Sequence, residues 1–125
     1  MISQVKTYKD LIFWQKAYLV ARGVFALCRK LPHDQISLII SKQIIRSATS
    51  IGANIAEGFG RYKGKEYERF LQIALGSAQE TEYWLILLKD EFSGLKVEIE
   101  VVDGHTQETI KMLIKSLGSL RSTNH

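Results

Sequence analysis

Proline and cysteine are almost absent from the 125-residue chain, and each occurs once, as Pro32 and Cys28. Long stretches without proline favour helices, because proline removes an amide donor and its ring clashes with the preceding turn. A single cysteine cannot form a disulfide within the chain, and a thiolate metal site needs further ligands. We therefore expect Cys28 to be a buried and unreactive thiol.

Long apolar runs are also missing. No run approaches the roughly 18 apolar residues that a membrane-spanning helix needs. Residues 1–10 mix polar and charged side chains, and they lack the apolar stretch and the cleavage site of a secretory signal. These absences predict a cytoplasmic protein with no membrane partner.

The sequence signatures of common active sites are absent as well. There is no P-loop and no nucleophile elbow. The spacing of Gly58 and Gly60 suggests a dinucleotide fingerprint, but Lys63 stands where the third glycine is needed. The three histidines lack the spacing that brings two ligands to one metal. The sequence therefore predicts a protein that is not an enzyme and holds no metal or cofactor.

Apolar residues at helical spacing are what the chain has in abundance. Steps of three and four predict four helices, over residues 8–31, 36–57, 65–91 and 97–120. Four helices with short connections predict an all-α, antiparallel up-down four-helix bundle. The length fits a single domain over residues 1–125.

Residues 95–102 are harder to assign, because apolar and charged residues alternate there as they do in a strand. One isolated strand would have no partner. We therefore assign the segment to the start of the fourth helix, which we expect to be interrupted or weakened near Gly104.

The positions of the glycines predict a turn at the end of the second helix and a close approach between two helices. Gly58, Gly60 and Gly64 are expected to supply the positive-φ positions that end the second helix. Gly52 lies inside that helix among other small residues, where it costs roughly 1 kcal/mol relative to alanine. Close approach of another helix is the expected compensation.

The first two helices have more apolar surface than one face of a bundle needs. The first has two apolar stripes, one from Leu11 to Cys28 and the other from Phe13 to Leu27. The second is apolar on nearly all sides. We expect the second helix to be the most buried, or to cover an extra face against another subunit.

Charge is distributed unevenly along the chain, whose net charge is +4. Residues 1–65 contain eleven basic and three acidic residues, and residues 66–125 contain six basic and ten acidic ones. A basic half beside an acidic half permits head-to-tail self-association or binding to a polyanion. The alternative is a chance division of charges over solvated surfaces.

Basic residues interleaved with aromatic ones suggest a nucleic-acid surface. Basic side chains bind phosphates and aromatic rings stack on bases. Ordinary solvated helix surface remains the alternative. The candidate nucleic-acid-binding residues are Arg22, Arg29, Lys30, Lys42, Arg46, Arg61, Lys63 and Lys65.

Several polar residues lie in or beside apolar segments, namely Asn54, Glu57 and Glu80 together with Arg46 and Arg61. Arg46 lies about three helical turns before the glycine-rich connection that follows the second helix, and Glu80 lies roughly four helical turns after that connection. The two side chains could therefore approach each other across the helix pair. A structural ion pair or helix-end cap is the favoured interpretation, ahead of ligand contact.

Two segments carry a family resemblance. The segment 43–61, with its block Asn-Ile-Ala-Glu-Gly-x-Gly-Arg at 54–61, and the segment 70–80 resemble the four-helix bundle proteins encoded in intervening sequences of bacterial 23S rRNA genes. Members of that family are also called ribosomal proteins. Residues 14–17 and 111–113 match too, so the resemblance covers nearly the whole chain. It implies an antiparallel bundle that assembles as a ring-like homopentamer.

Two hypotheses about function follow. The first is a nonenzymatic, oligomeric protein that binds RNA, or DNA, and is associated with the 23S rRNA intervening sequence. The second is a protein–protein interaction scaffold with no specific nucleic-acid ligand, in which the oligomer presents a surface to a protein partner.

Overall fold

The computed structural model describes residues 5–61 and 64–123, and this part of the chain is helical with no strand. The α-helices are α1 (Ile12–Arg29), α2 (Gln35–Phe59), α3 (Gly64–Glu91) and α4 (Lys96–Thr123). Two short 3-10 helices, η2 (Tyr8–Asp10) and η3 (Ser93–Leu95), precede α1 and α4. The predicted all-α fold with four helices is confirmed.

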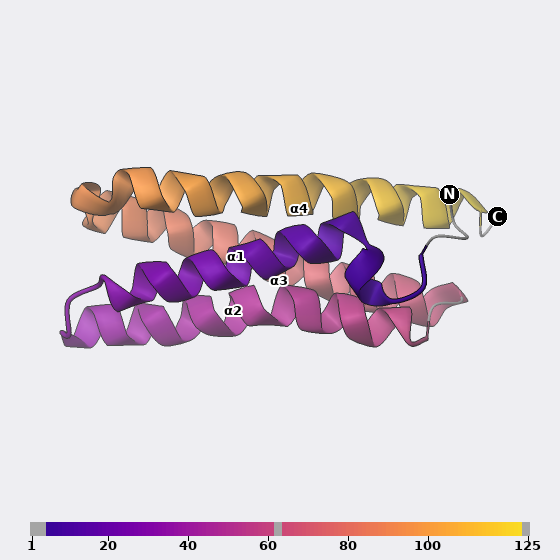
Figure 1. Ribbon diagram of the computed structural model, residues 1–125, viewed down its shortest axis with the longest axis horizontal. Helices are drawn as coiled ribbons and strands as arrows, with labels where there is room; N and C mark the ends of the chain where they lie inside the picture. The colour runs from indigo at the N-terminus through magenta and orange to yellow at the C-terminus, as the bar shows by residue number, and fades with distance from the viewer. Residues whose placement is uncertain (1–4, 62–63, 124–125) are drawn as a thin grey trace.

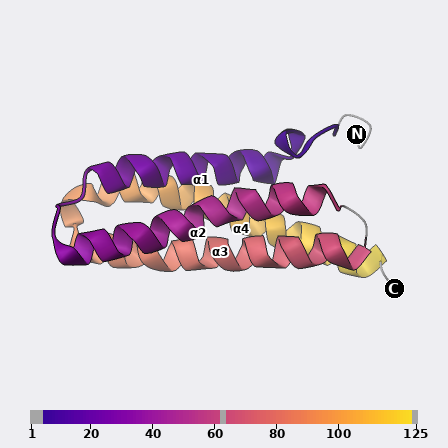
Figure 2. The same cartoon turned by 90° about the horizontal axis from the view of Figure 1, so that it is seen from below.

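The four α-helices lie side by side along one long axis, and the chain turns back at each connection (Figure 1). Helix α2 packs against α1 and α3, and α4 packs against the same two helices, so the bundle is closed (Figure 2). At one end, Glu98 near the start of α4 pairs with Lys30 just after α1, at 3.1 Å. There Glu100 also pairs with Lys89 near the end of α3, at 3.2 Å.

The core is made of aliphatic side chains at helical spacing, to which each helix contributes one stripe. In α1 the buried stripe is the one from Phe13 to Leu27, whereas the stripe from Leu11 to Cys28 is at most partly buried. Burial of one such side chain stabilises the fold by about 1.5–3 kcal/mol. The largest fully buried aliphatic residues are Ile44, Ile51, Ile55, Leu71, Leu85, Leu88, Ile99 and Leu113.

Side-chain caps set the starts of the first elements. Thr7 and Asp10 form a capping box, but it caps η2 and not α1. Leu11 then has an extended backbone, so α1 begins at Ile12, four residues later than predicted. Helix α2 begins after Asp34, whose Oδ1 accepts a hydrogen bond of 2.8 Å from the Ser37 amide.

Two predictions about glycines were wrong. Gly58 is a buried residue inside α2, and Gly60 after it has a φ of −65°, so neither supplies a positive φ. Packing against α3 leaves no room for a side chain at Gly58, because a Cβ there would lie 2.8 Å from Phe70 Cβ. Gly104 does not interrupt α4, since the helix is continuous and its packing outweighs one residue's weak propensity.

Candidate nucleic-acid interface

The helices divide the charge of the protein between two sides of the bundle. Together α1 and α2 contain five basic residues and one acidic residue, whereas α3 and α4 contain seven basic and ten acidic residues. Between residues 11 and 56 the sequence has one carboxylate, that of Asp34 at the N-cap of α2. The α1–α2 side is therefore basic, with a net charge of +4 against −3 for the other two helices.

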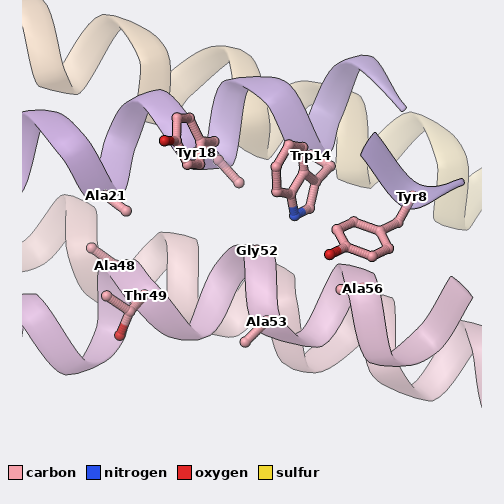
Figure 3. Close-up of a pocket in the computed structure, with 10 residues that line it drawn as sticks. Tyr8, Trp14, Tyr18, Ala21, Ala48, Thr49, Gly52, Ala53 and Ala56 are labelled. Atoms are coloured by element: carbon pink, nitrogen blue, oxygen red, sulfur yellow. The ribbon is translucent and has the colours of Figure 1, made fainter. Parts of the chain in front are cut away.

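An open cavity of about 300 Å³ lies between α1 and α2 near the start of α1. Tyr8 from η2 and Trp14 and Tyr18 from α1 form one wall (Figure 3). Small residues of α2, among them Gly52 and Ala53, form the other. We refer to this cavity as the aromatic groove.

Ring contacts hold the aromatic wall together. The rings of Trp14 and Tyr18 are stacked with centroids 5.4 Å apart, and Tyr8 meets Trp14 edge-on at 5.2 Å. The close helix approach expected at Gly52 is not seen: a Cβ there would lie 3.4 Å from Trp14 Nε1, an ordinary contact with a side chain, and the residue lines the open groove. The half-buried stripe of α1 thus lines a groove instead of completing the core.

A second cavity of about 300 Å³ lies further along the same pair of helices. Phe25 and Arg29 line it from α1, and Leu38, Ser41 and Ile45 line it from α2. Arg29 thus places a cation beside the apolar surface of this second cavity.

Three of the candidate basic residues border this side and form no ion pair within residues 5–61 and 64–123: Arg22, Arg29 and Lys42. Arg22 donates a hydrogen bond of 3.2 Å to the Tyr18 hydroxyl, and its guanidinium lies 5.9 Å from that ring's centroid. Lys42 is exposed on α2. Their charges are available to an anionic ligand.

The other candidate residues are paired or lie elsewhere. Lys30 pairs with Glu98 on α4, and Arg61 pairs with Glu57 one turn earlier in the chain, at 3.0 Å. Lys65 is exposed in the first turn of α3. Lys63 lies outside the described residues. Because Lys42 and Arg61 are about five helical turns apart, the predicted set is not one patch.

Arg46 meets Glu80 across α2 and α3, as the spacing suggested, and the Glu80 carboxylate also accepts a hydrogen bond of 3.0 Å from Trp84 Nε1. Asn54 donates to the Ser50 carbonyl at 2.8 Å. Ser77 on α3 reaches Ser50 Oγ at 3.0 Å. These bonds form a polar seam that joins the two helices.

Sequence reasoning missed the buried part of this seam. The Ser47 and Thr81 hydroxyls lie 2.9 Å apart, and both side chains are buried. A small polar residue at a core position of each helix was the available signal. Glu57, by contrast, pairs with Arg61 just beyond the end of α2 and does not take part.

Burial shifts the pKa of one thiol and of one phenol. Burial raises the pKa of the Cys28 thiol, although a hydrogen bond with Ser41 opposes the shift, and burial also raises the pKa of Tyr67.

Among the described residues no group of three or more His, Cys, Asp or Glu side chains is placed to hold a metal ion. In that same part of the chain, no helix has the length and apolarity to cross a membrane.

The fold and this surface define an all-α bundle protein with one basic, groove-bearing side. The chain belongs to the 23S rRNA-intervening sequence protein family, whose model matches residues 9–115. It is similar to the crystal structure of a protein of unknown function from the S23 ribosomal protein family of Bacteroides thetaiotaomicron VPI-5482. The identity is 35%, the TM-score is 0.76, and the match covers 84% of this chain and 97% of that one. A search of curated proteins finds no match.

Proposed function

We propose that this protein is a nonenzymatic, self-associating bundle that binds RNA through its α1–α2 side, including RNA of the 23S intervening sequence. The observation that carries the proposal is the set of cations on this side, Arg22, Arg29 and Lys42, which no carboxylate among the described residues neutralises. Phosphates replace the missing carboxylates when such a surface binds nucleic acid.

The proposed partner also includes further copies of the chain, arranged as a homopentamer. Large apolar side chains are exposed on all four α-helices of the single chain, among them Ile39 on α2, Ile86 on α3 and Val97 on α4. Exposed apolar surface of this kind is typical of protein interfaces. Repetition of the basic side in one assembly would add avidity without any new contact.

The test measures the affinity of a labelled intervening-sequence RNA hairpin for two charge-reversal variants. Arg29→Glu with Lys42→Glu changes the proposed surface. Lys111→Glu with Lys115→Glu makes the same change in net charge on exposed positions of α4. We expect the first variant to weaken binding more than tenfold and the second to retain most of the affinity. Equal losses would reduce the effect to general electrostatics and overturn the proposal.

The oligomeric state is measured on the same samples by sedimentation equilibrium. We expect both charge variants to keep the wild-type mass, so that any loss of RNA affinity is separate from loss of assembly. A monomer at micromolar concentration in the wild type would contradict the proposed self-association.

A protein-interaction scaffold is the second candidate, and one feature of the α1–α4 side favours it. Val97 is 72% exposed and Val101 is 59% exposed, and both line an apolar cavity of about 270 Å³ with Gly23 and Ala26 of α1. A scaffold predicts a partner protein that remains bound after nuclease treatment. It also predicts RNA binding only at low salt and without preference between RNA and DNA.

A further inference from the structure

We infer that the aromatic groove binds an unstacked base of single-stranded RNA, an inference that rests on the proposed RNA-binding function. The aromatic wall and the small-residue wall leave an open slot beside three rings (Figure 3). Proteins bind single strands by stacking bases on aromatic side chains beside a basic track.

The aromatic rings are accessible and held in place. Tyr18 is 46% exposed, and Trp14 is partly buried against the core. The stack of Trp14 on Tyr18 and the edge contact of Tyr8 fix the ring planes before any ligand arrives. A preformed stacking surface loses little conformational entropy when a base binds.

Cations flank both ends of the groove. At one end the Arg22 guanidinium is hydrogen-bonded to Tyr18, and at the other Lys9 Nζ lies 5.9 Å from the Tyr8 ring centroid. The nearby carboxylates are already engaged. Asp10 accepts from the backbone amides of Lys6 and Thr7, at 2.8 and 3.0 Å, and Glu57 pairs with Arg61. The charge of the groove therefore suits the phosphates on either side of a bound base.

The geometry of the groove also predicts whether the bound RNA is single-stranded or a duplex. A base inside a duplex is stacked and paired, so it cannot enter a slot between two helices without leaving the duplex. The groove thus predicts preference for loops and single strands over a duplex of the same sequence, whereas basic residues alone give no such preference.

Tryptophan fluorescence reports on the groove directly. The chain has two tryptophans, Trp14 and Trp84, so Trp84→Phe leaves the groove residue as the only reporter. We expect a single-stranded RNA oligonucleotide to quench this fluorescence with saturation. A duplex of the same sequence should bind without quenching, and adenosine monophosphate should need much higher concentrations.

Two substitutions and one control separate stacking from charge. Tyr18→Ala should lower the affinity for the single strand about 5- to 150-fold. Its effect on duplex binding should be much smaller and limited to the loss of the hydroxyl to which Arg22 donates. Ala53→Leu, at an exposed helical position that lines the groove, should fill the slot and have the same effect. Tyr83→Ala removes an exposed tyrosine from α3 and should change neither affinity.

The contrary outcomes are distinct. RNA binding with unchanged Trp14 fluorescence and an unaffected Tyr18→Ala variant would overturn this inference and leave the proposed function standing. Absence of binding to either RNA form would overturn both. A fluorescence change on dilution without RNA, abolished by Ala53→Leu, would show that a second copy of the chain fills the groove. Equal affinity for adenosine monophosphate would make the groove a nucleotide pocket and overturn the assignment to a strand.

Discussion

The hydroxyl groups of Ser47 and Thr81 lie 2.9 Å apart between α2 and α3, where both side chains are excluded from solvent. About one turn along, Ser50 and Ser77 repeat the contact at 3.0 Å. Both pairs would separate if either helix shifted by one residue. The polar seam therefore selects one register for two helices whose aliphatic contacts alone are less specific.

Ser47→Ala tests this relationship, and we expect it to destabilise the fold by about 1–2 kcal/mol in urea unfolding. The substitution removes a partner of the buried Thr81 oxygen, which also bonds to the Ser77 carbonyl. Removing both hydroxyls with Ser47→Ala and Thr81→Val should cost less than the sum of the single changes, because each single change already breaks the one bond between the two hydroxyls, which the double change loses only once. Strict additivity would contradict a coupled pair.

Glycine positions give a second, paired prediction. Gly58→Ala should destabilise the fold by about 1–3 kcal/mol, because the new methyl group would overlap Phe70 Cβ at the base of that side chain. Gly104→Ala should stabilise it by about 0.5–1 kcal/mol, since nothing lies within 4 Å of the added atom and alanine favours the helix. The two variants carry the same chemical change, so urea midpoints that shift in the same direction would contradict the packing argument.

These cases show how far the sequence predicts the structure. Spacing alone predicted the four helices and the approach of Arg46 to Glu80, which the structure shows as an ion pair. Both predictions depend only on the helical geometry that every α-helix shares. Spacing could not show that Gly58 is packed against Phe70, nor which stripe of α1 enters the core. Those outcomes depend on the rotation of each helix about its axis, which is decided by contacts between residues far apart in the sequence.

RNA binding should depend on salt in proportion to the phosphates that the protein contacts. Each contact made to single-stranded RNA contributes about 0.7 to the slope of log K against log salt concentration. Arg29→Ala with Lys42→Ala should therefore lower the slope by about 1.4 if each residue contacts one phosphate. The check is a titration series from 50 to about 300 mM salt. An unchanged slope would exclude both residues from the interface.

Cys28 should be alkylated slowly in the folded protein. Burial raises the pKa of this thiol, so less of it is thiolate at a given pH, and the thiolate is the nucleophile. Iodoacetamide labelling followed by mass spectrometry should give a slower rate than in urea-unfolded protein. Ser41→Ala removes the hydrogen bond that lowers the pKa and should slow the reaction further. Equal rates in folded and unfolded protein would contradict this account.

Asp34 should make part of the stability depend on pH. The Ser37 backbone amide donates to its carboxylate, which lowers the pKa of Asp34 below its ordinary value of 3.8. A lowered folded-state pKa adds stability that is present above the unfolded pKa and is lost as pH falls through the folded one. Asp34→Asn keeps an oxygen acceptor at the cap but carries no charge.

The difference in melting temperature between wild type and Asp34→Asn should therefore be constant from pH 5 to 7 and shrink below about pH 4. Asp34→Ala, which loses the cap altogether, should remain less stable than Asp34→Asn over the whole range. A difference between wild type and Asp34→Asn that grows on acidification would contradict the assigned role of the carboxylate.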